Sequence, residues 1–155
     1  MALGDIIKPL LKFTLHPYFR LVRGVTLGVR AVVLEGDNKV LLVRHTYYPG
    51  WMFPGGGVEH NQTLEDGLRK ELDEEVGVSL RARPELFGVY ANFEHFKGDH
   101  IALFIVRDWE KIERQCLEIA EYGFFGLDNL PEGITSGTKR RLHEISSCTD
   151  PGDQW

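Results

Sequence analysis

Three glutamates in the middle of the chain, Glu71, Glu74 and Glu75, are spaced so that their side chains fall on one face of an α-helix. Carboxylates held this close repel one another, and a divalent cation between them would remove the repulsion. Ligands that are all oxygen favour Mg²⁺, with Mn²⁺ as the nearest substitute. Taken alone, such glutamates are more typical of a solvated acidic helix with ion pairs along it, so a second feature has to decide.

The second feature is a glycine loop directly before the helix. Pro54 is followed by Gly55, Gly56 and Gly57, which leave the backbone amides and carbonyls unshielded by side chains. Such a loop suits the close approach of a metal ion or a phosphate group. The loop and the acidic helix together therefore predict a site for a divalent cation and phosphate.

The helix has recognisable ends. Thr63 is a good N-cap, with Asp66 three residues later, and Gly77 is the residue expected just beyond the C-terminus. At about 100° per residue, one side of the helix becomes an apolar stripe. The stripe consists of Leu64, Leu68, Leu72 and Val76. We expect the three glutamates to lie at the edge of this stripe.

The segment that starts at Gly56 and ends at Val78 resembles the Nudix box, G-x5-E-x7-R-E-U-x-E-E-x-G-U, in which U is an apolar aliphatic residue. The positions that match are Gly56, Glu71, Leu72, Glu74, Glu75, Gly77 and Val78. Two positions differ, because Gln62 replaces a glutamate and Lys70 replaces the arginine. A pattern of this length is far more specific than a glycine motif alone.

The resemblance implies hydrolysis of a diphosphate bond in a nucleoside diphosphate linked to another group. It implies that Glu74 and Glu75 are the principal metal ligands and that the backbone carbonyl of Gly55 is a further ligand. Glu71 matches a position that serves as a general base in some members and as a ligand in others. Lys70 is expected to act in catalysis. A lysine holds the Glu71 carboxylate less rigidly than the bidentate guanidinium of an arginine would.

Family members often use one more acid from outside the box. Glu121 is the first candidate for this additional metal ligand, because its setting just before an expected strand at residues 122–127 resembles that of the family's outlying glutamate. The further candidates are Glu118, Glu94 and Asp99. Each of these acids is also typical of an ordinary protein surface.

Several residues near the glycine loop are candidates for substrate contacts. Arg44 and His45 end an expected strand that leads toward the loop, where they could bind phosphates together with Gly56 and Gly57. Aromatic side chains that could stack on a base are Tyr47, Tyr48, Trp51, Phe93 and Phe96. For the aromatic residues, packing in the core or at its rim is the more common role.

Composition limits the class of protein. The chain has 155 residues, enough for one domain with a real core, and its 18 basic and 23 acidic residues give a net charge of −5. This charge argues against a protein that binds nucleic acids by bulk electrostatics. Cys116 and Cys148 have no zinc-site spacing and fit a reducing, cytoplasmic environment.

We expect three regions in the chain. Residues 1–23 are apolar with scattered positive charge and lack the uncharged stretch of about 20 residues that a membrane span requires. This segment is expected to pack on its own domain or on a partner subunit, with a homodimer as one form. Residues 24–148 form a single domain, and residues 149–155 form a mobile tail.

The pattern of elements predicts an α+β fold. A hairpin at residues 25–47 is followed by the acidic helix, by strands at 86–93, 100–109 and 122–127, and by a helix at 138–146. These elements predict a mixed sheet covered on both faces. The family resemblance implies the same architecture, an α/β/α sandwich in which the box forms a loop-helix-loop.

Two other functions remain open from the sequence. The altered Gln62 and Lys70 are compatible with a module that binds or senses a nucleotide, or another diphosphate, with little turnover. An isomerase of prenyl diphosphates on the same fold is disfavoured, because no cysteine lies near the box. The residues do not identify the group attached to the diphosphate, and specificity in this fold is carried by loops outside the box.

Overall fold

A computed structural model describes residues 24–94, 96–113 and 118–155. Its centre is a five-stranded sheet in the order β4-β5-β1-β2-β7. The strands are β1 (Thr26–Glu35), β2 (Lys39–His45), β4 (Glu85–Ala91), β5 (Asp99–Val106) and β7 (Ile119–Gly126). β1 pairs with β5 in parallel, and the other pairs in this sheet are antiparallel. The predicted mixed sheet is therefore confirmed, while the segment 1–23 lies outside the described residues.

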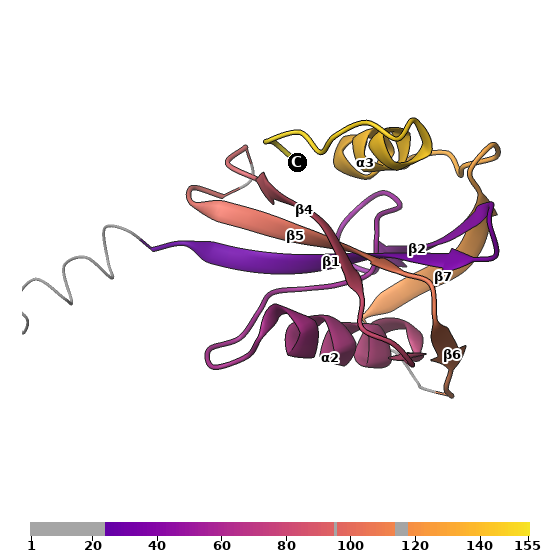
Figure 1. Cartoon of the computed structure of the whole chain (residues 1–155), viewed down its shortest axis with the longest axis horizontal. Coiled ribbons are helices and arrows are strands. Elements are labelled where there is room, and N and C mark those ends of the chain that lie inside the picture. The colour runs from indigo at the N-terminus through magenta and orange to yellow at the C-terminus, as the bar shows by residue number, and fades with distance from the viewer. Residues whose placement is uncertain (1–23, 95, 114–117) are drawn as a thin grey trace, which may run out of the picture.

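Two helices cover the two faces of the sheet. Helix α2 (Leu64–Val76) lies on one side and α3 (Ser136–Ser146) lies on the other, as Figure 1 shows. This arrangement is the expected α/β/α sandwich. The α3 helix starts two residues earlier than the sequence predicts and ends at the predicted residue.

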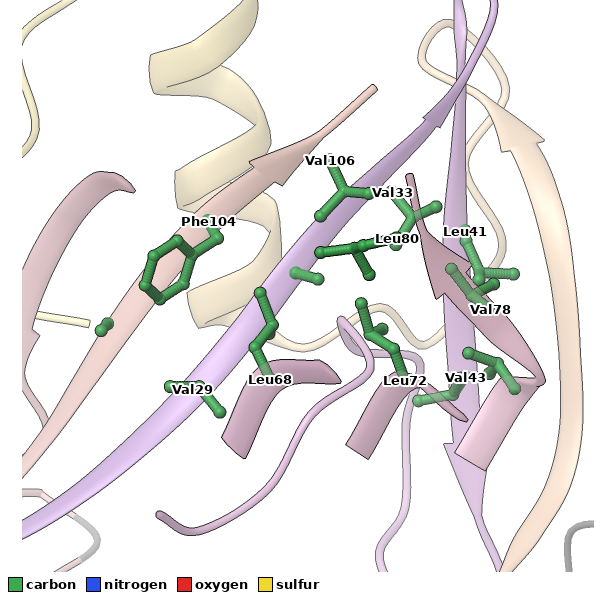
Figure 2. Close-up of a cluster of buried hydrophobic side chains, with 13 residues drawn as sticks. Val29, Val33, Leu41, Val43, Leu68, Leu72, Val78, Leu80, Phe104 and Val106 are labelled. Carbon is green, nitrogen blue, oxygen red and sulfur yellow. The ribbon is translucent and has the colours of Figure 1, made fainter. Parts of the chain in front are cut away.

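The apolar stripe of α2 fixes the acidic helix against the sheet. Leu68, Leu72 and Val76 are almost completely buried, and they pack against side chains of β1, β2 and β5. Figure 2 shows Leu68 and Leu72 among the valines, leucines and Phe104 of this cluster. Burying side chains of this size stabilises the fold by about 2 kcal/mol each.

Both ends of α2 are formed as the sequence predicts. The Thr63 hydroxyl accepts a hydrogen bond from the Asp66 backbone N–H at 3.1 Å. Gly77 has φ of 60°, the left-handed conformation that favours glycine at this position. The glutamates are thus carried by a helix whose ends and buried face are both specified.

The predicted hairpin forms only at its tip. β1 and β2 pair at two positions, Leu34 with Val40 and Glu35 with Lys39, and then they separate. The glycine loop fills the space between them, because Met52 pairs with Val43 of β2 while Pro54 and Gly56 accept hydrogen bonds from the backbone of β1. The loop is therefore held between the two strands at the centre of the sheet.

A second, two-stranded sheet was not predicted. β3 (Val78–Leu80) directly follows α2 and pairs with β6 (Trp109–Lys111). The predicted strand at 100–109 is split, because β5 ends at Val106 and the chain bends before Trp109. The Trp109 indole N–H donates to the Leu34 carbonyl at 2.8 Å, which fastens this small sheet to the main one.

Residues 149–155, expected as a mobile tail, end in contacts with β4. The Ala91 backbone N–H donates to the Asp153 carbonyl at 2.8 Å, and the Trp155 N–H donates to the Ala91 carbonyl at 2.9 Å. The Trp155 indole packs edge-on against Tyr90 and lies against Gly137, where a Cβ would overlap it. Residues 153–155 thus add to the edge of the sheet at β4.

Replacing Trp155 with alanine is expected to destabilise the protein by about 2 kcal/mol, because a partly buried aromatic contact with Tyr90 and Gly137 is lost. Urea unfolding measures this change. Asp150→Ala, in the exposed part of the same segment, is the control and should change stability by less than about 0.5 kcal/mol. Equal, negligible effects of both substitutions would mean that the segment is free.

Candidate active site

A cleft of about 1020 Å³ opens beside the glycine loop. Its walls come from β1, from the end of β2, from the loop, from α2 and from the start of α3. Of the three box glutamates, Glu71 and Glu75 line this cleft, together with Gly55, Gly56 and Gly57. The loop and the acidic helix therefore come together as the sequence predicts.

Glu75 is the most enclosed acid in the cleft, with 8% of its surface exposed. Its Oε2 accepts a hydrogen bond from the Gly55 backbone N–H at 2.7 Å. Its Oε1 lies 3.6 Å from Nε2 of His45, which is itself buried at the end of β2. One carboxylate thus connects α2, the glycine loop and β2.

Two of the glycines are required by close approaches. Gly55 has φ of 134°, and a Cβ at this position would collide with the Val29 carbonyl of β1. A Cβ at Gly56 would overlap the carboxylate of Glu71. The loop therefore lies directly against β1 on one side and against a carboxylate of α2 on the other.

Arg30 is a cleft residue that the sequence analysis missed. It projects from the middle of β1, and its Nη1 donates to the Gly55 carbonyl and, more weakly, to the Phe53 carbonyl at 3.4 Å. The signal in the sequence is a single cation inside an apolar strand, between Val29 and Ala31. Such a residue needs polar partners when the strand is central in a sheet.

Burial raises the pKa of both box carboxyls that line the cleft, Glu71 and Glu75. For Glu75 the pKa rises to about 7, because loss of solvent outweighs the Gly55 N–H and the nearby Arg30. The pKa of Glu71 is also raised, first by burial and then by the charge of Glu74. Burial, followed by the charge of Arg30, lowers the pKa of His45, so its imidazole is neutral near pH 7. The cleft thus has too little positive charge to compensate both glutamates when they are ionised.

Comparison with known proteins identifies the family. A family model described as the NUDIX domain matches residues 24–144. The chain belongs to the Nudix family. A MutT-like protein of Streptomyces ambofaciens is 36% identical over 126 residues, which cover 81% of this chain and 80% of that protein.

Other relatives and structures agree. An ADP-ribose pyrophosphatase of Methanocaldococcus jannaschii is 32% identical over 105 residues, covering 64% of this chain and 62% of that protein. The chain spans 25% and 62% of the first two curated relatives that it matches. The crystal structure of a MutT NUDIX hydrolase from Burkholderia pseudomallei superposes with a TM-score of 0.68 at 24% identity, covering 77% of this chain and 97% of that one. This structural likeness shows the same fold.

The remaining predicted residues of the Nudix box lie outside the cleft lining. Glu74 is exposed on α2, where its charge still acts on Glu71. Lys70 forms an ion pair with Glu59 at 2.6 Å, and this hydrogen bond raises the pKa of the lysine. Lys70 therefore meets Glu59 in the turn before the helix.

Three of the four acids considered outside the box line the cleft, namely Glu118, Glu94 and Asp99. Glu121, the first candidate, instead binds Arg44 across β2 and β7 at 2.6 Å, and neither residue lines the cleft. Glu118 lines the cleft close to His45 and Tyr47, and its charge contributes to the raised pKa of Glu75. The pairing of β2 with β7 shifts by one residue between Arg44 and His45 and continues to Glu118, whose carbonyl accepts from the Thr46 N–H at 3.1 Å.

The donor set suits a hard divalent cation that keeps water ligands. Within residues 24–94, 96–113 and 118–155, no three acids, histidines or cysteines are arranged as a complete metal site. Glu71, Glu75 and the Gly55 carbonyl nevertheless provide oxygen donors around one end of the cleft. Mg²⁺ commonly uses one or two carboxylates and several waters, so an incomplete protein shell fits this ion.

In the part of the chain that the structure describes, no helix is long and apolar enough to span a bilayer.

The raised pKa of Glu75 predicts a pH-dependent stability when divalent cations are removed with EDTA. Because the folded state holds this proton more tightly than the unfolded state, the contribution is complete below about pH 4.5 and is lost as the pH rises through about 7. The loss is about 3 kcal/mol at most, from the size of the pKa difference. Thermal unfolding between pH 5 and 8 measures it.

Glu75→Gln is the matched variant, because its amide oxygen can still accept the Gly55 N–H but carries no charge. This variant should unfold at a higher temperature than the parent protein at pH 8 and at a similar temperature at pH 5. A parent protein that gains stability over Glu75→Gln as the pH rises would show that the carboxylate is well compensated.

Proposed function

We propose that this chain hydrolyses the diphosphate bond of a nucleoside diphosphate linked to another group. The observation that carries the proposal is the contact of Glu75 with the Gly55 N–H, beside Glu71 against Gly56, at one end of an open cleft. Membership of the Nudix family supports it, as does the likeness to a protein named ADP-ribose pyrophosphatase. The substrate class is a small nucleotide, because the cleft volume suits a ligand of that size and the net charge of −5 disfavours a polyanionic polymer.

The proposed cofactor is Mg²⁺, with Mn²⁺ as a substitute. Glu71, Glu75 and the Gly55 carbonyl would hold it, with Glu74 and Glu118 adding negative charge nearby. When bound, the cation would offset the charge of the diphosphate oxygens and make a bound water more acidic. Two carboxyls with raised pKa values fit this role, since a dication favours their ionised forms.

The protein side chains have distinct tasks in this proposal. Glu75 fixes the glycine loop through the Gly55 N–H, so the backbone that faces the substrate keeps one conformation. Glu71 is only half-buried and lies at the cleft surface, where it serves either as a ligand to the cation or as the base that takes the proton of the attacking water. The buried Nδ1 of His45 has no hydrogen-bond partner among the residues that the structure describes, and a substrate oxygen could supply one. The catalytic contribution is thus mainly positioning and electrostatics.

Purified protein is expected to release the products of diphosphate cleavage in the presence of Mg²⁺, from at least one member of a panel of nucleotide sugars, ADP-ribose, dinucleoside polyphosphates and nucleoside triphosphates. Glu75→Gln should lower kcat at least about 100-fold, because a central electrostatic element is removed. Glu65→Gln is the matched control on the same helix, since Glu65 pairs with Arg69 outside the cleft. Its kcat should stay within about twofold of the parent value.

Tight nucleotide binding without turnover across the whole panel would contradict hydrolysis and favour a sensor module. Normal turnover by Glu75→Gln would leave hydrolysis standing and remove Glu75 from the metal site.

Substitution of the two neighbouring loop glycines tests the placement of Glu71. A methyl group at Gly56 would push the Glu71 carboxylate aside, so Gly56→Ala should lower kcat at least about tenfold. A methyl group at Gly57 meets no atom within 4 Å, so Gly57→Ala should change KM and leave kcat within about threefold. Steady-state kinetics with the best substrate of the panel measures both. Equal kcat values for the two variants would show that Glu71 does not depend on the loop.

A further inference from the structure

One backbone oxygen in the cleft has two possible partners that carry positive charge. The Gly55 carbonyl accepts a hydrogen bond from the Arg30 guanidinium. In the proposed function the same oxygen is the backbone ligand to the cation. Arg30 is permanently charged, because a guanidinium keeps its proton at physiological pH. A guanidinium and a dication on the same oxygen would repel each other strongly at this distance.

The loop cannot easily turn this oxygen away from Arg30. The Gly55 N–H is held by Glu75, and the residues on either side of Gly55 accept hydrogen bonds from Ala31 and Val29 of β1 at 3.0 and 2.9 Å. The direction of the Gly55 carbonyl is therefore set by backbone contacts on both sides. The guanidinium is the part that can move, since it ends a long side chain with several rotatable bonds.

The cleft offers Arg30 a second kind of partner. Arg30 lines the cleft, so its remaining N–H groups can reach a ligand that enters there. The guanidinium fork matches two oxygens of a phosphate group in a bidentate hydrogen bond. A diphosphate would thus accept hydrogen bonds from Arg30 while its other oxygens bind the cation, and its negative charge would separate the two positive groups.

We infer that Arg30 couples metal binding to diphosphate binding, an inference that rests on the proposed function. Without a diphosphate, Arg30 holds the Gly55 carbonyl and weakens the affinity for the cation. With a diphosphate, Arg30 transfers its hydrogen bonds to the ligand, and each ligand then strengthens the binding of the other. Arg30 is therefore a residue that makes the site selective for the pair of ligands over the free cation.

The test measures Mn²⁺ affinity by electron paramagnetic resonance of the free ion, with and without saturating methylenediphosphonate, whose P–C–P bridge resists hydrolysis. In the parent protein the diphosphonate should tighten Mn²⁺ binding at least about fivefold, the lower end of typical coupling between sites. Arg30→Met, which keeps the unbranched apolar part of the side chain and removes the charged guanidinium, should bind Mn²⁺ alone at least about fivefold more tightly and lose most of the coupling.

Arg140→Met is the matched control. Arg140, in the middle of α3, also lines the cleft, but its guanidinium donates to the Trp155 carbonyl. This variant should keep both the parent Mn²⁺ affinity and the parent coupling within about twofold. Arg30→Lys retains the charge without the fork, so its affinity for Mn²⁺ alone should stay closer to the parent value than that of Arg30→Met.

Two results would overturn the inference. One is a parent protein whose Mn²⁺ affinity does not respond to the diphosphonate, which is measured without any variant and so does not depend on whether Arg30→Met folds. The other is an Arg30→Met protein with weaker or unchanged Mn²⁺ affinity. Because both results are binding equilibria, a protein that hydrolyses diphosphates without coupling would refute only this inference, and coupling without turnover would refute only the proposed hydrolysis.

Discussion

The site depends on the pairing of a buried carboxylate with a backbone amide. Glu75 is nearly enclosed, and a buried carboxyl without a partner costs several kcal/mol, so its bond to the Gly55 N–H constrains both elements that it joins. The position of Glu75 relative to the sheet is fixed by helix α2, which the buried Leu68 and Leu72 hold in place. The position of the Gly55 N–H is fixed by the positive φ of this residue and by its contact with β1. Packing, backbone conformation and chemistry are therefore set by the same few contacts.

The electrostatics of the cleft are unfavourable for the protein by itself. Burial raises the pKa values of Glu71 and Glu75, while Arg30 supplies a positive charge that only partly compensates them. Groups held in this way are typical of functional sites, where the fold tolerates local instability for the sake of a ligand. The two apolar clusters on either side of the sheet provide the stability that allows it. A ligand with two positive charges would offset the charges of ionised Glu71 and Glu75.

Local patterns were sufficient to predict the helix, but they could not predict the contacts between residues that are distant in the sequence. Thr63, the apolar stripe and Gly77 act within one helix, so their spacing alone predicts α2 correctly. The separation of β1 from β2 depends on the loop that enters between them, which strand patterns do not contain. Arg30 meets Gly55 across 25 residues, and Glu121 pairs with Arg44 of the neighbouring strand while Glu118 lines the cleft. Trp155 docks on β4 although a terminal segment rich in polar residues is typical of a free tail.

The two departures from the Nudix box have a common location, which explains why they need not disable the site. Gln62 accepts a hydrogen bond from the Glu59 N–H at 3.1 Å, and Lys70 binds the Glu59 carboxylate at 2.6 Å. Both residues therefore stabilise the turn that leads into α2, and neither one lines the cleft. An arginine at position 70 would be long enough to bind Glu59 or to reach toward Glu71, whereas the lysine is held by Glu59. Alignment of Glu71 then rests on Gly56 and on the packing of α2, and Gly56, Glu71 and Glu75, which match the pattern, all line the cleft.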